Sequence, residues 1–227
     1  MSRDHVCVMN QPAEFNDTRN EPAVRGFLHT PENANGNALV LTHGAGGNCQ
    51  SKLLVAVSQA FSDAGFLVLR INLPFRQQRP FGPPSPGGAA RDREGLQRAV
   101  EVMKPKVAGK LFLGGHSYGG RQATMLAAEN HTLVDGLLLF SYPLHPPRKP
   151  TQLRTAHFPQ LMTPALFVHG SRDPFGLLEE LGPALELIPA KHELVPVEGG
   201  GHDLIGKKAR PDFPADVVSA FRKFFNI

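Results

Sequence analysis

Short apolar runs alternate along this chain with segments in which apolar residues recur every three or four positions. The runs are typical of buried strands, and we expect strands at 38–42, 66–71, 110–113, 136–141, 165–169 and 193–197. The recurring positions are typical of amphipathic helices, which we expect at 50–64, 90–104, 120–130, 177–187 and around 217–225. Strands that alternate with helices at short spacing predict an α/β fold, with a mostly parallel sheet covered on both faces.

The rest of the chain is less regular. We expect a strand pair around 6–9 and 23–29, a loop over the Pro- and Gly-rich residues 74–88, and a break near Pro183 in the helix at 177–187. The segment 142–163 is rich in proline and is expected to form no large cap. The sequence contains no internal repeat and no long linker, so we predict a single domain over 1–227 without a separate lid domain.

Composition narrows the classes of function. A hydrophobic content of 41% in 227 residues is enough for a substantial core, and no apolar run approaches the ~18 residues of a membrane span. The first residues lack the apolar segment of a secretory signal, and two cysteines make no disulfide framework, so we expect a cytoplasmic protein without a membrane partner. The net charge of +4 is scattered, without zinc-ligand spacing or a dense basic stripe, so we expect neither a metal nor a nucleic-acid partner.

A motif with candidate chemistry lies between a predicted strand and a predicted helix. After the apolar run that ends at residue 113, the chain contains Gly115-His116-Ser117-Tyr118-Gly119. The G-x-S-x-G pattern in this context predicts a nucleophile elbow, a strained turn that raises a serine hydroxyl at the carboxyl edge of a sheet. Both glycines are needed because a side chain at either position would collide with the neighbouring strand and helix. Ser117 is therefore the candidate nucleophile.

Two further candidates follow later strands, at the edge where active sites of open α/β sheets lie. Asp173 comes after the strand ending at residue 169, and a carboxylate there can orient a histidine, although an aspartate before a proline is also a common turn former. His202 follows three glycines and the last predicted strand, and an imidazole suits proton transfer near neutral pH. An exposed loop histidine is the alternative interpretation of His202.

A glycine-rich loop, His43-Gly44-Ala45-Gly46-Gly47, follows the strand at 38–42. Its bare backbone can supply the N–H of Ala45, which together with the N–H of Tyr118 is predicted to hold an oxyanion. A phosphate-binding loop is the alternative, but the remainder of the P-loop pattern is missing.

Several side chains are candidates for contact with a substrate. Phe75 and Phe175 are candidates to line an acyl pocket, with plain core packing as the alternative. Arg76 is a candidate for binding an anionic substrate, with a salt bridge on a surface loop as the alternative. Arg121 lies in the first turn after the elbow, where a cation is unfavourable, so we expect it to pair with a carboxylate.

These motifs follow one another in the order oxyanion loop, Ser, Asp, His, each after its own predicted strand. At this point the chain resembles the α/β-hydrolase superfamily, from about residue 38 to the C-terminus. Within it, the stretches 43–47, 114–121 and 170–176 are similar to a small lidless subgroup that includes dienelactone hydrolases and the hydrolase-like domain of a nonspecific-lethal chromatin-complex subunit. The resemblance implies an α/β-hydrolase fold, a three-layer sandwich with a sheet of about 7–8 strands. It also implies nucleophile Ser117, acid Asp173 and base His202, without metal or organic cofactor.

The sequence therefore predicts a serine hydrolase that cleaves small or accessible carboxylic esters or thioesters through an acyl-enzyme on Ser117. Dienelactone hydrolases use a cysteine where this chain has Ser117, so their substrate does not transfer. One alternative is a non-catalytic interaction module that keeps the fold. Another is a peptidase or an acyltransferase, because all of these reactions share the acyl-enzyme. The oligomeric state is left open.

Overall fold

The computed structural model describes residues 11–205 and 211–227. Its strands are β1 (Ala13–Asp17), β2 (Val24–His29), β3 (Ala38–Thr42), β4 (Leu67–Asn72), β5 (Leu111–His116), β6 (Gly136–Phe140), β7 (Ala165–Gly170) and β8 (His192–Val197). Its helices are α1 (Lys52–Asp63), α2 (Pro74–Gln78), α3 (Ala89–Met103), α4 (Tyr118–Glu129), α5 (Leu178–Leu185) and α6 (Phe213–Phe225), with short 3-10 turns η1 (Lys104–Lys106) and η2 (Phe158–Gln160).

The eight strands form one sheet in the order β1-β2-β4-β3-β5-β6-β7-β8. The pairs β1–β2 and β2–β4 are antiparallel, whereas every pair from β4 to β8 is parallel, as the alternation of strands and helices predicted. Thr42 at the end of β3 pairs with Ile71 on one side and with Gly115 on the other. The carboxyl ends of these strands are therefore level, and the loops that follow them meet at one edge of the sheet.

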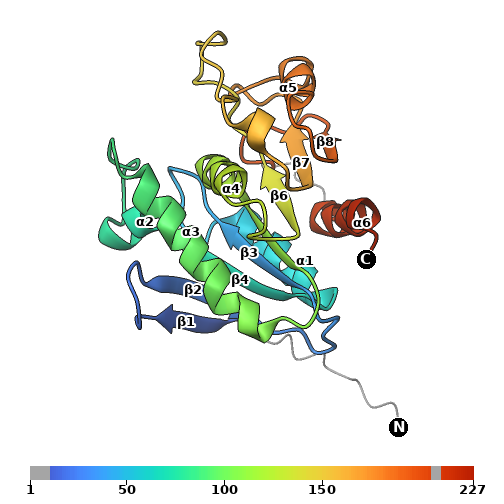
Figure 1. Cartoon of the computed structure of the whole chain (residues 1–227). Coiled ribbons are helices and arrows are strands. Elements are labelled where there is room, and N and C mark those ends of the chain that lie inside the picture. Colours follow the sequence, from blue (N-terminus) through green and yellow to red (C-terminus); the bar gives the residue numbers. More distant parts are fainter. Residues whose placement is uncertain (1–10, 206–210) are drawn as a thin grey trace.

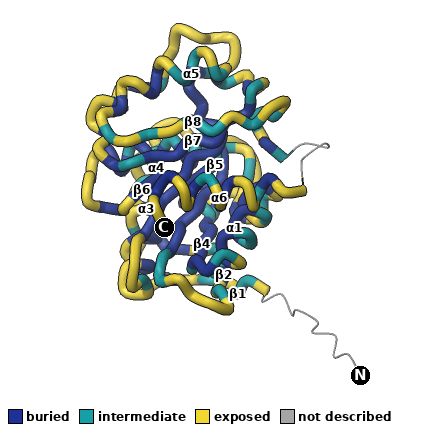
Figure 2. Tube along the Cα trace, turned by 90° about the vertical axis from the view of Figure 1, so that its right-hand side faces the viewer, coloured by how far each residue is buried: buried dark blue, intermediate teal, exposed yellow. Residues whose placement is uncertain are grey.

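Helices cover both faces of the sheet (Figure 1), which gives the three layers expected of this fold class. The central strand β3 is buried along its whole length and divides its apolar side chains between two cores. Val40 packs in the core beneath α3 and α4, with Leu96 and Val100, whereas Leu39 and Leu41 pack in the core beneath α1 and α6. Figure 2 shows buried strands inside a shell of partly exposed helices. A continuous apolar run is what a strand covered on both faces requires.

Several element boundaries differ from the predicted ones. Residues 74–78 form helix α2 instead of loop, because proline is well tolerated at the first position of a helix, where its missing N–H is not needed. Helix α5 continues through Pro183 instead of breaking there. In so short a helix, the proline removes few backbone hydrogen bonds, and the buried side chains of Leu181 and Leu185 hold the segment in place. The predicted strand at 6–9 lies outside the described residues, and β2 pairs with residues 13–17.

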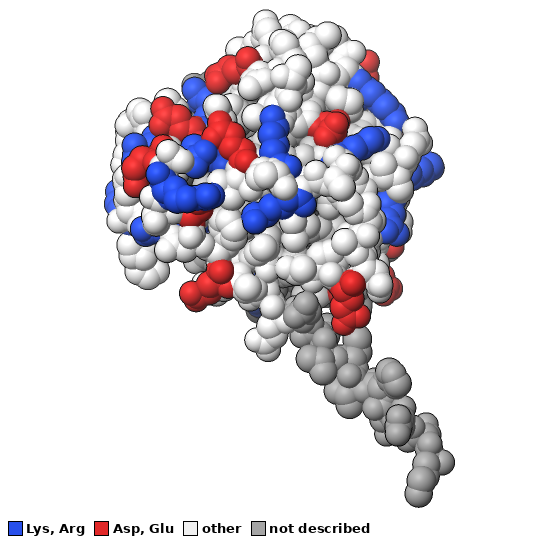
Figure 3. Space-filling view, turned by 60° about the horizontal axis from the view of Figure 1, so that its bottom comes forward, with Lys and Arg blue, Asp and Glu red and all other residues white. Residues whose placement is uncertain are grey.

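Charged side chains of both signs are interspersed on the face drawn in Figure 3, without a stripe of a single sign. Within the described ranges, none of the helices combines the length and the hydropathy needed to cross a bilayer.

Candidate active site

The turn between β5 and α4 has the strained geometry that the elbow motif predicts. Ser117 occupies the position before α4 with φ 51° and ψ −116°, a backbone conformation that non-glycine residues rarely adopt. A Cβ on Gly115 would lie 2.9 Å from the backbone of Gly119, and a Cβ on Gly119 would lie 2.5 Å from the carbonyl oxygen of His43. The bare glycines therefore let strand, helix and the loop after β3 come together beneath the serine.

A chain of hydrogen bonds links the three predicted catalytic residues, whose loops follow β5, β7 and β8. The imidazole Nδ1 of His202 lies 2.8 Å from Oδ2 and 3.0 Å from Oδ1 of Asp173, and its Nε2 lies 2.8 Å from Oγ of Ser117. A carboxylate can only accept, so Nδ1–H donates to Asp173 and Nε2 is left to accept from the serine hydroxyl. The structure thus brings Ser117, His202 and Asp173 together with the tautomer that a general base requires.

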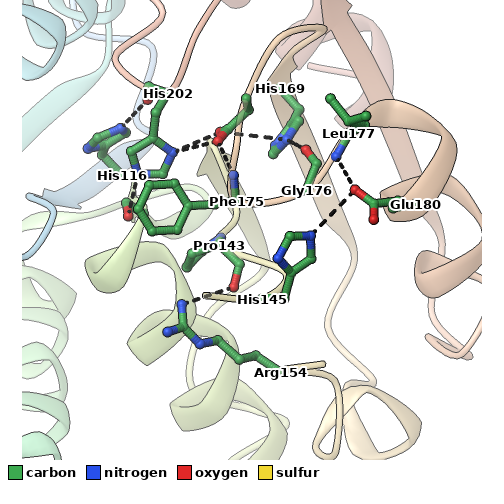
Figure 4. Close-up of polar contacts among 12 residues, drawn as sticks. His116, Pro143, His145, Arg154, His169, Phe175, Gly176, Leu177, Glu180 and His202 are labelled. Atoms are coloured by element: carbon green, nitrogen blue, oxygen red, sulfur yellow. Dashed lines mark hydrogen bonds and ion pairs between the residues drawn. The ribbon is translucent and has the colours of Figure 1, made fainter. Parts of the chain in front are cut away.

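Asp173 is completely buried and is held in place by its own turn. Its Oδ1 accepts the N–H of Phe175 at 2.9 Å, and the ring of Phe175 stacks on His202 with centroids 4.2 Å apart (Figure 4). A second histidine, His169, is fully buried on the other side of the carboxylate and donates from Nε2 to the carbonyl of Gly176. Burial lowers the pKa of His169 and so favours its neutral form. Of the two imidazoles beside the carboxylate, that of His202 is the partly exposed one, and it donates to Asp173.

The glycine-rich loop after β3 lies directly against the elbow. A Cβ on Gly44 would come within 3.3 Å of Cβ of Ser117, so the loop backbone borders the nucleophile. In the described part of the chain, the N–H groups of Ala45 and Tyr118 have no hydrogen-bond partner, and Tyr118 is the first residue of α4. Free amides at a helix start and in an adjoining glycine loop can stabilise an oxyanion. Ala45 and Tyr118 both line the cavity that contains Ser117, and their role as oxyanion donors stays a prediction.

Arg76 has a different role from the one that we expected. Its side chain is buried and donates to the carbonyls of Ala45 at 2.8 Å and Gly47 at 2.7 Å, and also to those of Arg79 and Gly82. These bonds occupy the guanidinium and tie the oxyanion loop to the segment after β4. Because its donors are used within the protein, Arg76 is not available to an anionic substrate.

Phe75 is also placed behind the site and not in it. It is buried against His43 and Tyr118 in edge-to-face contacts, and its N–H donates to the carboxylate of Asp92. The same carboxylate accepts the Tyr118 hydroxyl at 2.7 Å. Asp92 is completely buried, and burial raises its pKa. The motifs did not reveal this link between α3 and the elbow, since Asp92 resembles any acidic residue in a first helical turn.

A cavity of about 560 Å³ opens over the nucleophile. Its wall contains Ser117, His202 and the glycine-rich loop. Arg121 of α4, Pro143 and Arg154 from the segment between β6 and β7, and Phe175 from the loop after β7 also line it. Phe175 thus borders the cavity, as the sequence predicted, whereas Phe75 and Arg76 are not among the described residues that line it. The expected carboxylate partner of Arg121 is missing: no described residue forms an ion pair with it.

Two histidines that the sequence analysis passed over support the site. His116 precedes the nucleophile, and its Nε2–H donates to the carbonyl of His202 at 2.7 Å. His43 donates from Nδ1 to the carbonyl of Gly44 and accepts the N–H of Leu73. Burial is the main cause that lowers the pKa of each of these histidines to about 4, so both are neutral near pH 7. Both histidines bind backbone atoms, and residue spacing alone does not predict such bonds.

Within the described residues, no three His, Cys, Asp or Glu side chains form a group that could hold a metal ion.

Comparisons with known proteins agree with this fold. Est1E from Butyrivibrio proteoclasticus is similar in structure with a TM-score of 0.73, at 14% identity over 94% of this chain and 99% of that chain. Dienelactone hydrolase from Anabaena variabilis matches with a TM-score of 0.74, at 21% identity over 96% and 98% of the two chains. XC6422 from Xanthomonas campestris, described as an a/b serine hydrolase without lid, matches with a TM-score of 0.72, at 16% identity over 94% and 95%. At these identities the likeness concerns the fold alone.

The family comparison covers most of the chain. The model described as "Alpha/beta hydrolase domain" matches residues 35–222, a range that contains the glycine loop, the elbow and the loops that carry Asp173 and His202. The chain therefore belongs to the α/β-hydrolase family.

Proposed function

We propose that this protein hydrolyses carboxylic ester or thioester bonds through an acyl-enzyme on Ser117. The observation that carries the proposal is the unbroken chain from Ser117 Oγ to His202 Nε2, and from His202 Nδ1 to Asp173, with 2.8 Å at each link. A buried carboxylate, a correctly oriented imidazole and a strained serine are together the parts that make a hydroxyl nucleophilic.

In the first half-reaction, His202 takes the proton of Ser117 as the oxygen attacks the carbonyl carbon of the substrate. Asp173 stabilises the imidazolium that forms, because its buried carboxylate already accepts Nδ1–H. The amides of Ala45 and Tyr118 donate to the oxyanion of the tetrahedral intermediate. The alcohol or thiol then leaves with the proton from His202, and the acyl group stays on Ser117.

In the second half-reaction, water takes the place of the leaving group. His202 accepts a proton from the water as its oxygen attacks the acyl carbon, and the same amides hold the second oxyanion. Collapse of this intermediate returns the proton to Ser117 and releases the acid. One set of groups therefore serves both halves, as microscopic reversibility requires.

The surroundings of the site favour small or accessible substrates. Between β6 and β7, the described chain has η2 as its helical element, and the cavity opens directly over Ser117. A cavity of about 560 Å³ is of a size that takes a compact acyl group. The names of two structural neighbours, a dienelactone hydrolase and an a/b serine hydrolase, are in keeping with acyl chemistry.

Covalent labelling tests the proposal directly. A fluorophosphonate should add to the wild-type protein at Ser117, which mass spectrometry of the tryptic peptide identifies, and should not add to Ser117→Ala. Ser58→Ala, a buried serine on α1, is the matched control and should label like the wild type. Unlabelled wild-type protein is screened separately against p-nitrophenyl esters, acyl-CoA thioesters and short peptides. Absence of labelling would favour a non-catalytic module, and turnover of peptides alone would favour a peptidase.

A further inference from the structure

Two arginines border the catalytic cavity without an acidic partner. Arg121, in the first turn of α4, and Arg154, in the segment between β6 and β7, both line the cavity that contains Ser117. Among the described residues, neither guanidinium forms an ion pair. Within the part of the chain that the structure describes, the Nε atom of Arg121 is buried without a hydrogen-bond partner, and the side chain of Arg154 makes one long bond, 3.4 Å to the carbonyl of Pro143 (Figure 4).

The titratable groups on which the charge of Arg121 acts carry no negative charge of their own. Arg121 lies close enough to Tyr118, Tyr142, His157 and Arg154 to perturb the ionisation of each one. All four neighbours are neutral or positive at pH 7. Burial is the main cause that lowers the pKa of Arg154, and the charge of Arg121 is the next. The two guanidinium groups therefore repel each other in partly buried positions.

The location of Arg121 adds a second unfavourable interaction. Its N–H donates to the carbonyl of Ser117 at 2.9 Å as part of the first turn of α4, where the helix dipole presents positive partial charge. Buried charges are usually paired, and the two partly buried arginines of α3 show this: Arg93 pairs with Glu129 and Arg98 with Glu101. A pair of unpaired cations beside a nucleophile is thus a feature that folding alone does not explain.

We propose that Arg121 and Arg154 bind a carboxylate group of the substrate, so that the preferred ester carries a free acid in addition to the bond that is cleaved. A guanidinium presents a planar fork of donors that matches a carboxylate, and two of them can hold its two oxygens. Since Arg121 is one helical turn from Ser117, the acid and the scissile carbonyl are separated by a short linker. Pro143 and Phe175 provide apolar contacts for that linker.

This inference rests on the proposed function, and its test separates the two. Each acidic ester is compared with its primary amide, which has the same shape and no charge: the monomethyl half-esters of glutarate and adipate for an acid on the acyl side, and 5-acetoxypentanoate for an acid on the alcohol side. We expect a preference in kcat/KM of about tenfold or more for the acid in at least one pair, the contribution of charge-assisted hydrogen bonds. A smaller preference in every pair would overturn the inference, even where hydrolysis by Ser117 stands.

Three variants locate the source of the preference. In Arg121→Gln and Arg154→Gln, the ratio of kcat/KM between acid and amide should fall towards one. Arg148→Gln removes the same charge from an exposed position in the segment that also carries Arg154, and should keep the wild-type ratio. A ratio that falls equally in all three variants would show general electrostatic attraction and no site. Thermal melts check folding, and the melting temperature of Arg121→Gln should not fall, because no partner loses an ion pair.

A binding measurement covers the case in which the protein is not an esterase. Ser117→Ala, which cannot turn over the ester, is titrated by calorimetry with monomethyl adipate, monomethyl glutarate and 5-acetoxypentanoate, each against its amide. Tighter binding of at least one acid, lost in Ser117→Ala/Arg121→Gln, supports the anion site independently of catalysis. Equal binding of acid and amide in all three pairs would count against it, whatever the activity of the wild-type protein.

Discussion

The two sides of the cavity over Ser117 differ in how their polar side chains are hydrogen-bonded. On the loop side, Arg76 gives its donors to four carbonyls, and His43 bonds to the backbone through both ring nitrogens. On the side formed by α4 and the segment between β6 and β7, Arg121 and Arg154 line the cavity without an ion pair from any described residue. Arginine thus holds the backbone together by hydrogen bonds on one side, whereas on the other side it is a cation without an ion pair among the described residues.

This difference teaches how to separate structure from recognition at such a site. A buried polar group whose bonds are all made inside the protein has nothing left to offer a ligand, and its removal damages the fold. A partly buried group whose bonds are not made inside the protein is either a loss of stability or a contact for a ligand. Arg76 belongs to the first kind and the pair of Arg121 and Arg154 to the second.

Removal of the nucleophile between the two sides should have the largest effect. Ser117→Ala is expected to lower kcat on a responsive ester by about 10⁴- to 10⁶-fold, because the residual rate comes from the oxyanion amides and binding alone. Steady-state kinetics measures this fall in kcat, with the variant purified separately so that no wild-type enzyme contaminates it. Ser58→Ala is the control. A variant that kept wild-type turnover would show that Ser117 is not the nucleophile, and neither side of the cavity would then have a role in this reaction.

The next largest effect is expected for Arg76→Gln, which removes hydrogen bonds on the loop side. A shortened side chain cannot reach the carbonyls of both Ala45 and Gly47, so the oxyanion loop loses its tie to the segment after β4. We expect kcat to fall by about 10²-fold, similar to the loss of an oxyanion donor, with a smaller change in KM. Arg79→Gln, which alters an exposed neighbour, should change kcat less than twofold to threefold, an order-of-magnitude expectation for a surface change. If KM rose selectively for anionic esters, Arg76 would be a substrate ligand after all.

The contrast between the two sides also marks what the sequence could and could not predict. The sheet, its two covered faces and the elbow follow from patterns of short range: apolar runs, helical spacing and glycines flanking a serine. Asp173 and His202 could be located because each follows a strand whose carboxyl end is level with that of its neighbour.

The roles of individual side chains around the nucleophile could not be predicted in the same way. Arg76 and Arg121 both follow strands at the active edge, and nothing local distinguishes them. The role of each arginine depends on the groups that the fold brings near it. Arg76 meets carbonyls 29 and 31 positions away, whereas Arg121 meets Arg154, 33 positions away. The link from Asp92 to Tyr118 spans 26 positions and is equally invisible to local pattern.

The free energy of unfolding should depend on pH through His43, a neutral buried histidine of the loop side. Burial lowers the pKa of His43 to about 4, below the ordinary value near 6.5, so the unfolded chain binds more protons between these two pH values. Stability from this group is therefore complete above about pH 6.5 and is lost as the pH falls towards 4.

Urea unfolding at pH 7 and pH 5 measures this dependence. The loss of unfolding free energy on acidification should be smaller in His43→Gln than in the wild type by about 1 to 2 kcal/mol, the contribution of a single group with such a shift. His131→Gln, an exposed histidine, should leave the wild-type loss unchanged. Identical losses in wild type and His43→Gln would mean that the loop side tolerates a charged imidazole.

A stability effect of similar size concerns the hydroxyl of Tyr118, which joins the elbow to α3. Tyr118→Phe removes the donor to Asp92 and leaves one oxygen of a fully buried carboxyl without that bond, whereas its other oxygen keeps the N–H of Phe75. The free energy of unfolding should fall by about 1 to 2 kcal/mol, and the raised pKa of Asp92 should rise further because a bond to its charged form is lost. Tyr142→Phe, which removes a hydroxyl that donates to the neutral backbone carbonyl of Arg154, is the control and should cost about 1 kcal/mol or less. Because the N–H of Tyr118 is retained, kcat should change little in Tyr118→Phe, and a large fall in kcat would mean that Asp92 positions the oxyanion donors and does not merely brace the helix.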